Sequence, residues 1–414
     1  MSDHFDKLET QEHAQREREL FAKLPDFLRK AIAAAPGWAH RLNGFDVASV
    51  VSRETLARIP VLRKPELMEA QAANPPFGGF ADMSQLAGAR YFMSPGPVWE
   101  PQATGADTWN SARAFHAAGI GPDDLVHNAL SYHMTPGGFI LDEGARAVGA
   151  RVFPGGVGNT EQQVEAAHVL KPTAYAGTPD FLKTMLEKAG ETGRDLSSIR
   201  KALVSGGALF PSLREEYRSR GVSVMQCYAT ADLGVIAYET QKDGNPLPGM
   251  VVSENIFLEV VRPGTDDPVP AGEVGEIVVT NFNAAYPLIR FGTGDLSALL
   301  DEPSPCGRTN LRIKGWMGRA DQRTKVKGMF VDPKQVDQVV KAVAGIARAR
   351  LVVTREGDSD VMTLQVEPRA GERPDTQAVE AALTAQTRLK GRVELAQNLP
   401  NDGKIIDDKR DYSK

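Results

Sequence analysis

The sequence predicts an α/β protein with a large layered N-terminal domain, a β-rich subdomain within it, and a small α+β C-terminal domain. Three patterns support this prediction. Between about residues 108 and 205, short apolar stretches alternate with helical patterns, which is typical of a mainly parallel sheet covered by helices. After about residue 245, apolar strands are separated by Pro/Gly turns. Residues 333–395 combine helical and strand patterns in a separate package.

The chain has 414 residues, more than a single ordinary core, so we expect two domains, residues 1–318 and 319–414. A formal net charge of −5 gives no reason to expect a nucleic-acid or anionic-membrane partner. No stretch approaches the roughly 20 apolar residues of a membrane span, and no secretory signal is evident, so we expect a cytoplasmic protein. Its two cysteines, Cys227 and Cys306, exclude a disulfide framework and a Cys-rich zinc site.

The elements follow in order along the chain. Apolar residues at helical spacing predict a helix within residues 1–35, and residues 59–67 read as a loop running into a helix. In the alternating region we expect helices at 108–118, 139–148, 160–170 and 180–189, and strands at 125–130, 150–153, 174–176, 201–204 and 222–225. Further strands are expected at 256–261, 276–280, 349–354, 361–367 and 392–395, and helices at 333–343 and 376–387.

Four motifs could carry chemistry. In residues 287–295, two glycines flank Thr293 and predict a tight turn that presents Asp295, whose carboxylate suits a pair of ribose hydroxyls; a plain turn aspartate is the alternative. Tyr228 could stack on a purine, and Asp232 could hold Mg²⁺ against phosphate; a buried tyrosine and a capping aspartate are the alternatives. Residues 318–321 could be a charged linker. Lys404 is a flexible point charge that could reach a phosphate, or a solvated tail lysine.

In sequence order, these four motifs resemble those of the acyl-adenylating superfamily. Shorter strings are similar to the phenylacetate–CoA ligase group in particular: Gly158-Asn159-Thr160-Glu161, Gly177-Thr178-Pro179, Pro287-Leu288-Ile289-Arg290 and the run from Pro400 to Arg410. The resemblance extends from about residue 55 to residue 410. It implies the adenylate-forming enzyme fold, in which a small C-terminal domain moves against a large nucleotide- and acid-binding domain.

The resemblance also implies site residues. Tyr228 would stack on adenine, Asp232 would bind Mg²⁺, and Asp295 and Arg319 would hold the ribose hydroxyls. The backbone around the adenine would come from Ser205, Gly206, Gly207 and Ala208, with Ala229 beside Tyr228. In the small domain, Asp321 would be the hinge, Gly328 would line the CoA tunnel, and Lys404 would be the catalytic lysine that bridges the carboxylate and the α-phosphate.

The phosphate loop departs from the group's pattern, which resembles S-S-G-T-T-G-K-P. The matching stretch, residues 94–101, keeps Ser94 and Gly96 but has no threonine, and Glu100 puts a negative charge where lysine is expected. Ala229 and Ala231 also replace the group's usual glycine and hydroxyl residue. Either the loop is a variant that works by other groups, or the chain has kept the scaffold and lost efficient use of ATP.

The acid would be bound beyond the strand at 125–130, where Tyr132 and His133 lie among glycines; ordinary loop packing is the alternative. The resemblance implies a homodimer that uses ATP, Mg²⁺ and coenzyme A to convert a small carboxylic acid, aromatic by the same resemblance, to acyl-AMP and then to acyl-CoA. Two rivals stay open: an adenylating enzyme with a different acceptor, and a non-catalytic homologue that binds nucleotide or CoA.

Overall fold

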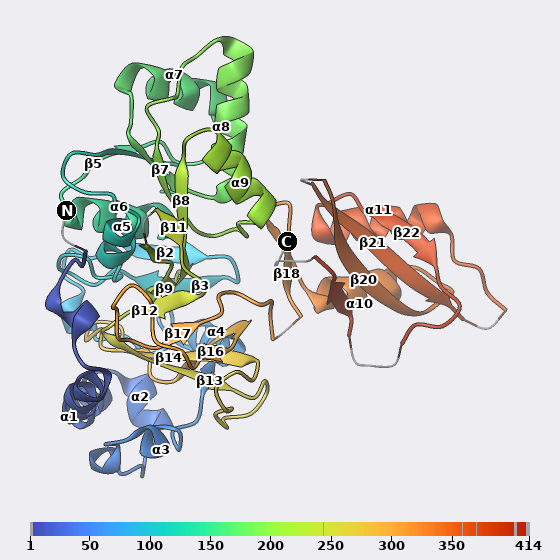
Figure 1. Ribbon diagram of the computed structural model, residues 1–414. Helices are drawn as coiled ribbons and strands as arrows, with labels where there is room; N and C mark the ends of the chain where they lie inside the picture. Colours follow the sequence, from blue (N-terminus) through green and yellow to red (C-terminus); the bar gives the residue numbers. More distant parts are fainter. Residues whose placement is uncertain are drawn as a thin grey trace. The chain divides into compact units, whose positions relative to one another are not determined.

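The computed structural model describes residues 3–242, 244–320, 322–357, 359–369, 371–400 and 404–410. The chain divides into two compact units, Met1–Trp316 and Met317–Lys414, whose course is traced by colour in Figure 1. This division falls two residues before the boundary expected from the sequence.

The first unit is built on a nine-stranded sheet. Its strands, in spatial order, are β16 (Leu299–Leu300), β17 (Arg312–Ile313), β12 (Met250–Val252), β9 (Gly234–Tyr238), β8 (Ser223–Thr230), β7 (Lys201–Val204), β6 (Ala174–Gly177), β4 (Leu125–Asn128) and β5 (Arg151–Pro154). From β8 to β5 all neighbours are parallel, and β9 is antiparallel to β8. Strands buried on both faces need continuous apolar runs, and all four residues of β6 are buried.

Helices separate the parallel strands along the chain, and other helices precede them. In the first unit they are α1 (His13–Ala34), α2 (Pro36–Arg41), α3 (Arg53–Leu56), α4 (Lys64–Ala73), α5 (Ala112–Ala117), α6 (Gly137–Ala147), α7 (Thr160–Leu170), α8 (Pro179–Thr192) and α9 (Pro211–Ser219), with single 3₁₀ turns at Lys7–Thr10, Val47–Ser49 and Met83–Gln85. Figure 1 shows α7, α8 and α9 at one end of this unit and α1, α2 and α3 at the other. The expected alternation of helices and strands is confirmed.

A second sheet of the first unit has four strands, in the order β1 (Leu62–Arg63), β15 (Phe291–Ser297), β14 (Gly275–Asn281) and β13 (Ile256–Val261). Here the expected tight turn before Asp295 is wrong, because residues 291–297 form strand β15. A Cβ on Gly292 would lie 2.7 Å from Glu276 Oε1, and Gly294 has φ +74° beside a register shift in the pairing with β14. The two glycines therefore allow close strand contact and a bulge.

Arg290 fixes the beginning of β15. Its side chain has no exposed surface and pairs with Glu259 (Nε–Oε2, 2.9 Å). The remaining guanidinium nitrogens donate to the backbone oxygens of Ala57, Ile59 and Asp266. One arginine thus joins the chain before β1 to the strand that carries Asp295, because a planar fork of donors can satisfy several acceptors at once.

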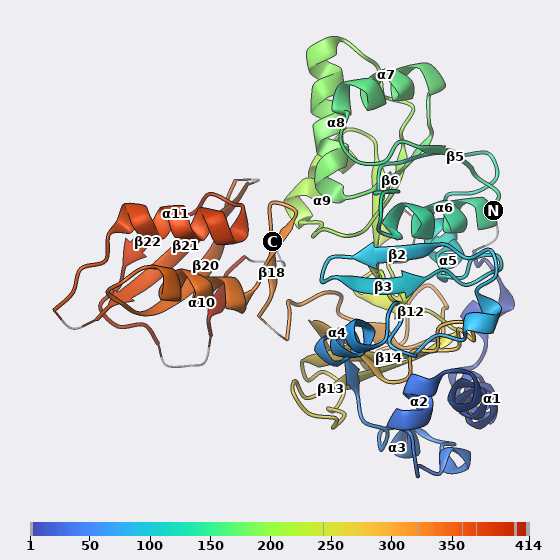
Figure 2. The same ribbon diagram turned by 180° about the vertical axis from the view of Figure 1, so that it is seen from behind.

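Two hairpins complete the first unit. Strands β2 (Tyr91–Ser94) and β3 (Val98–Pro101) form one of them, drawn in cyan in Figure 2. Strands β10 (Gln241–Lys242) and β11 (Asn245–Pro246) form the other. Among the described residues, no helix has both the length and the apolar character of a membrane-spanning segment.

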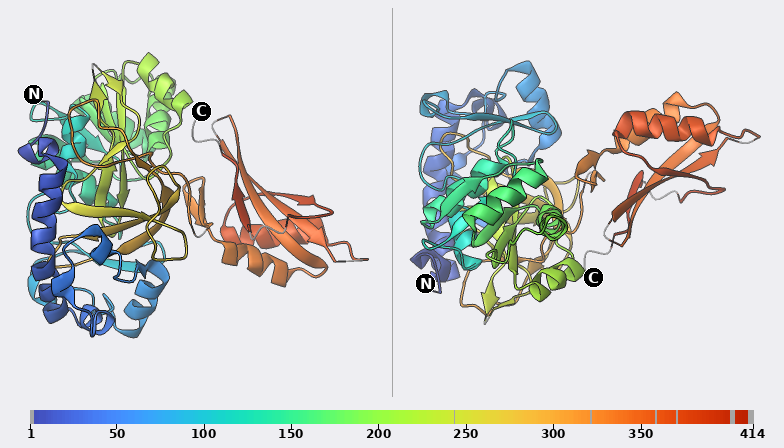
Figure 3. Two further views of the ribbon diagram at one scale, coloured as in Figure 1. Left: turned by 60° about the horizontal axis from the view of Figure 1, so that its bottom comes forward. Right: turned by 90° about the horizontal axis from the view of Figure 1, so that it is seen from above.

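The second unit has its own core. Its elements are β18 (Thr324–Val326), β19 (Met329–Val331), α10 (Pro333–Ala342), β20 (Ile346–Glu356), β21 (Ser359–Pro368), α11 (Thr376–Thr387), β22 (Arg392–Leu395) and β23 (Ile406–Asp408). The sheet order is β22-β21-β20-β23, and α10 and α11 cover one of its faces (Figure 3). The α+β character expected for this part of the chain is confirmed.

Candidate active site

The candidate site lies at the carboxyl edge of the parallel strands. Five segments leave the sheet there, because parallel strands end on the same side. They begin after β4 (Ser131, Tyr132), β5 (Gly155, Gly156), β6 (Thr178), β7 (Ser205 to Ala208) and at the end of β8 (Tyr228 to Asp232). In open α/β sheets, ligands bind at this edge, where the strand order changes direction.

Tyr228 and Asp295 meet although they belong to different sheets. The Tyr228 hydroxyl donates to Asp295 Oδ2 over 2.8 Å, and Trp316 Nε1 donates to Asp295 Oδ1 over 3.0 Å. Both Tyr228 and Asp295 are buried, at 7% exposure each. Donors on both oxygens fix the plane of the carboxylate. The structure therefore joins two of the motifs that the sequence analysis assigned to one nucleotide.

The segment after β7 presents mainly backbone. The Ser205 hydroxyl donates to the carbonyl of Cys227 over 3.0 Å, so this side chain connects β7 to β8. Gly206 has φ +70°, a left-handed conformation that glycine adopts at little cost. Gly206 and Gly207 are exposed, and Ala208 is half-buried. A flat, small-residue surface of this kind can approach a planar ring closely.

Asp232 follows a β-bulge. The pairing of β8 with β9 shifts register between Tyr228 and Ala229, which turns the chain out of the sheet just before Asp232. The Asp232 side chain has no exposed surface, and Lys64 Nζ from α4 lies 2.8 Å from its Oδ2. An aspartate oxygen is a hard donor of the kind Mg²⁺ takes, and Mg²⁺ at a nucleotide needs only one or two protein carboxylates. Asp232 therefore fits one such ligand, with Lys64 as a competing cation.

The expected phosphate loop is the β2–β3 hairpin. Ser94 ends β2, is buried, and donates from Oγ to Glu100 Oε1 over 2.5 Å; Gly96 lies in the exposed turn. Burial and the neighbouring Asp232 charge raise the pKa of Glu100 to about 8. This shift favours the protonated form of Glu100 near neutral pH and so reduces the negative charge that the sequence places in the loop. A buried carboxyl in a low-dielectric site takes up a proton because its charged form is poorly solvated.

Tyr132 is held by its neighbours. Its hydroxyl donates to Asp142 Oδ2 (3.0 Å) and accepts from Asn128 Nδ2 (2.7 Å), and its ring meets Phe139 edge-on at 5.1 Å. Burial raises the pKa of Tyr132, so the phenol stays neutral. His133 is exposed. Tyr132 can thus present a fixed ring at this edge. The exposed His133 has no comparable set of side-chain contacts with the described residues that would assign it a role.

Four expected site residues belong to the second unit, and the structure describes three of them. Arg319 is half-buried. Lys404 is exposed and pairs with Asp407 Oδ1 at 3.4 Å. Gly328 (φ +82°) and Lys327 (φ +49°) form the two-residue turn of the β18–β19 hairpin, a position that requires left-handed residues. The expected hinge, Asp321, lies outside the described residues.

Two residues at the site were not assigned from the sequence. Lys64 belongs to residues 59–67, which read as a loop running into a helix and also resemble the phenylacetate–CoA ligase group, but nothing in its spacing indicates the contact with Asp232. Trp316 lies two residues before the Gly318-Arg319 motif, and that proximity was the one available signal.

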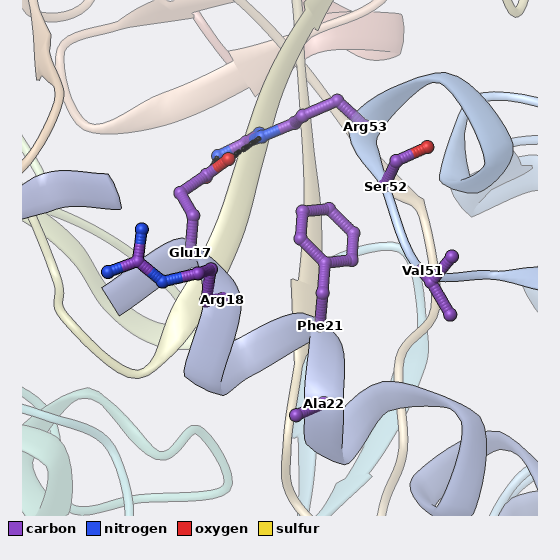
Figure 4. A pocket seen from close by; sticks show the side chains of 7 residues that line it. All are labelled: Glu17, Arg18, Phe21, Ala22, Val51, Ser52 and Arg53. Atoms are coloured by element: carbon purple, nitrogen blue, oxygen red, sulfur yellow. Dashed lines mark hydrogen bonds and ion pairs between the residues drawn. The ribbon is translucent and has the colours of Figure 1, made fainter. Parts of the chain in front are cut away.

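A hollow of about 410 Å³ lies away from these residues, between α1 and the segment before α3 (Figure 4). It is lined by Glu17, Arg18, Phe21, Ala22, Val51, Ser52 and Arg53. No proposed site residue lines it. Within the part of the chain that the structure describes, no three His, Cys, Asp or Glu side chains gather as a metal cluster.

Comparison with known proteins defines the class first. Residues 106–285 match the family of AMP-binding enzymes. The phenylacetate–coenzyme A ligase of Thermus thermophilus is 33% identical over 341 residues, covering 78% of this chain and 74% of that protein. The Escherichia coli (strain K12) phenylacetate–coenzyme A ligase is 29% identical over 329 residues, covering 75% and 72%.

A solved structure extends the likeness to nearly the whole chain. A 2-hydroxyisobutyryl-CoA ligase, in complex with its acyl-AMP and CoA, superposes with a TM-score of 0.80 at 26% identity and covers 99% of this chain and 93% of that one. The chain belongs to the phenylacetate–CoA ligase family of acyl-adenylating enzymes.

Proposed function

We propose that this chain activates a carboxylic acid with ATP, releasing pyrophosphate, and then transfers the acyl group from AMP to the thiol of coenzyme A. One observation carries the proposal: the 2.8 Å hydrogen bond between Tyr228 and Asp295 brings two nucleotide motifs, 67 residues apart in sequence, to one place. An aromatic acid is favoured by the phenylacetate named for two relatives, and a small hydroxy acid is the alternative suggested by the third.

The proposal gives each unit a role. Within the first unit, Tyr228 stacks on the adenine, Asp295 accepts the ribose hydroxyls, and Tyr132 forms part of the acid pocket. The backbone beside the adenine comes from Ser205, Gly206, Gly207, Ala208 and Ala229, with Ser94 and Gly96 near the phosphates. The second unit brings Arg319 to the ribose, Lys404 to the reacting groups and Gly328 to the pantetheine path, with Asp321 as the hinge.

The chemistry explains why a lysine is needed. A carboxylate oxygen attacks the α-phosphorus, the bond to the pyrophosphate oxygen breaks, and negative charge grows on the phosphoryl oxygens. The Lys404 ammonium stabilises that charge and holds the two anionic reactants together. Mg²⁺, when bound, would neutralise phosphate charge, and Asp232 is the residue that would hold it. In the second step the CoA thiolate attacks the acyl carbonyl and AMP leaves.

The proposal also includes a cellular compartment and an oligomeric state. We expect the protein in a reducing cytoplasmic compartment, which suits free Cys227 and Cys306. We expect a homodimer, as the family resemblance implies; sedimentation measurements across a concentration series test this.

The deciding experiment is a screen of phenylacetate, 2-hydroxyisobutyrate, and series of aromatic and fatty acids. Pyrophosphate exchange reports the first half-reaction, and product analysis with and without CoA reports the second. Lys404→Ala should lower adenylation at least about 100-fold, because its ammonium acts only in the first transition state. Thioester formation from supplied acyl-AMP should persist.

The chain offers a matched control for this lysine. Lys409 is also exposed and pairs with the same Asp407, at 3.7 Å. Lys409→Ala should leave both half-reactions intact. Equal loss of the two half-reactions in Lys404→Ala, or loss of adenylation in both variants, would contradict the role of Lys404.

A second candidate function is supported by the β2–β3 hairpin. Its Ser94 hydroxyl donates to the buried Glu100, whose pKa is raised, and the hairpin contains no lysine. This favours a homologue that binds nucleotide or CoA without turning ATP over. Calorimetric binding of ATP and CoA, with no pyrophosphate exchange for any acid of the panel, would establish it.

A further inference from the structure

One side chain in the second unit joins the segment next to the expected hinge to the segment that carries Lys404. Gln322 Oε1 accepts the backbone N–H of Ile405 over 2.7 Å and that of Ile406 over 3.3 Å. Gln322 itself has φ +59°, which non-glycine residues rarely adopt. Its side chain reaches across 83 positions of sequence to the residue that directly follows Lys404.

The bonds to Gln322 complete an edge strand. Strand β23 lies at the edge of its sheet, and its inner side pairs in parallel with β20, where Leu351 is opposite Ile406. Leu351 N donates to Ile405 O over 2.9 Å on that inner side. An edge strand leaves its outer backbone groups without a neighbouring strand. Gln322 supplies an acceptor for the N–H of Ile406, the first residue of β23, and for the N–H of Ile405 just before the strand.

A second connection joins the same two segments. Arg410 donates to Asp408 Oδ1 (2.8 Å), to Thr324 Oγ1 (2.8 Å) and to the carbonyl of Lys325 (2.8 Å). Thr324 Oγ1 also donates to Asp408 Oδ2 over 2.7 Å. The Arg410 side chain is 6% exposed, so these are buried polar contacts with charged partners, which are the strong kind. Residues 322–325 and 405–410 are therefore bound together at both ends.

The burial pattern supports the same connection. Ile406 is buried in the core of the second unit together with Val326 and Val331 from the β18–β19 hairpin. Lys404, by contrast, is exposed. Lys404 thus lies just before an anchored strand. The backbone amides that directly follow it, those of Ile405 and Ile406, are hydrogen-bonded to Gln322.

From these contacts we propose that Gln322 is a positioning residue: it clamps the backbone after Lys404 to the segment after Asp321, so that Lys404 moves as one body with the hinge side of the second unit. The inference rests on the proposed function for the role of Lys404. Rotation about a hinge can deliver a side chain accurately only if that side chain is rigidly connected to the rotating part. Gln322 provides this connection within the second unit.

Three variants test the clamp. Gln322→Ala removes the acceptor, Gln322→Glu keeps an oxygen acceptor at the same reach, and Gln377→Ala changes an exposed glutamine of α11 in the same unit as a control. The first readout is hydrogen–deuterium exchange at the amides of Ile405 and Ile406. Loss of a hydrogen bond worth roughly 1.4 kcal/mol corresponds to about tenfold faster exchange. Gln322→Glu and Gln377→Ala should exchange like wild type.

The second readout is the rate of each half-reaction. It distinguishes a residue that positions Lys404 from one that only satisfies the backbone of the edge strand. With the acid that turns over in the panel above, Gln322→Ala should slow pyrophosphate exchange about tenfold and leave thioester formation from supplied acyl-AMP within about twofold of wild type. Gln322→Glu should restore adenylation. Unchanged exchange at Ile405 and Ile406 in Gln322→Ala would overturn the clamp. Faster amide exchange with unchanged adenylation, or no rescue by Gln322→Glu, would overturn the positioning role.

Failure of the proposed function would look different. If wild-type protein adenylates no acid, the ligase proposal falls, while amide exchange in the same three variants still decides whether Gln322 holds the strand. If Gln322→Ala loses its thermal unfolding transition, Gln322→Glu decides: a folded Glu variant with wild-type exchange and adenylation supports the clamp, and a folded Glu variant lacking adenylation refutes it.

Discussion

Lys64 Nζ lies 2.8 Å from Asp232 Oδ2, and the aspartate side chain it meets has no surface in contact with solvent. The two residues come from different parts of the chain, the first turn of α4 and the turn after β8. Both charges act on the buried Glu100: the negative charge of Asp232 raises the pKa of Glu100, and the positive charge of Lys64 lowers it. The positive charge of Lys64 therefore offsets the negative charge of Asp232 beside the β2–β3 hairpin, where the sequence predicts weakened phosphate binding.

Removing Lys64 should cost stability. Lys64→Ala leaves the buried Asp232 carboxylate without its cation, and we expect the free energy of unfolding to fall by about 2–3 kcal/mol, since an unpaired buried charge is poorly tolerated. Urea denaturation measures this. Lys30 pairs with Asp26 at the same 2.8 Å but with side chains 76% and 49% exposed, so Lys30→Ala should cost far less stability than Lys64→Ala. Similar losses in the two variants would show that burial of Asp232 is unimportant.

Glu100 should make stability fall as pH rises. Its pKa is about 8 in the folded protein against an ordinary value of 4.5, so the folded state holds a proton that the unfolded state has released. The contribution of the Glu100 proton to folding stability is fully present below about pH 4.5. It is lost progressively as pH rises from there through 8.

Glu100→Gln tests this dependence. Between pH 6 and pH 9, wild type should lose on the order of 2 kcal/mol of unfolding free energy more than Glu100→Gln loses. Urea titrations at several pH values measure the difference. Glu273→Gln, at an exposed position, should follow wild type. Parallel curves for wild type and Glu100→Gln would mean that Glu100 is ionised throughout.

The hydrogen bond from Tyr228 to Asp295 should matter for nucleotide binding. Tyr228→Phe keeps the ring and removes the donor, so AMP affinity should fall by about three- to tenfold, the range of one ordinary hydrogen bond. Asp295→Ala removes the expected ribose acceptor and should weaken AMP binding more, by about 10- to 100-fold. Calorimetry with AMP measures both, and Tyr91→Phe, at an exposed tyrosine, is the control. A larger loss in Tyr228→Phe than in Asp295→Ala would contradict this order.

Arg290 should prove structural and intolerant of lysine. Lysine keeps the charge but lacks the planar fork that reaches Glu259 and the backbone of Ala57, Ile59 and Asp266. We expect Arg290→Lys to lower the unfolding free energy by about 3 kcal/mol, since several buried acceptors lose their donors. Arg262, whose side chain is 59% exposed beside Glu273, offers a control in Arg262→Lys. Denaturation profiles that coincide for the two variants would remove the structural role.

The order of the elements was largely determined by the sequence. Helix and strand periods in residues 108–205 predicted α5 to α8 and β4 to β7 within a few residues, because a buried parallel strand must be apolar and the helices between strands must be amphipathic. The motifs at Tyr228, Asp295, Arg319 and Lys404 were also predictable from the sequence. A short motif is defined by which residues stand a few positions apart, and the family resemblance depends on the same information.

Only the tertiary structure decided what those residues touch. The glycines before Asp295 were read as a turn, yet they lie in strand β15, because whether glycine serves a turn or a close strand contact depends on a neighbouring strand far away in sequence. The raised pKa of Glu100, the contact of Lys64 with Asp232, and the hydrogen bond of Gln322 with Ile405 likewise depend on burial and on partners up to 168 positions distant, which no local pattern encodes.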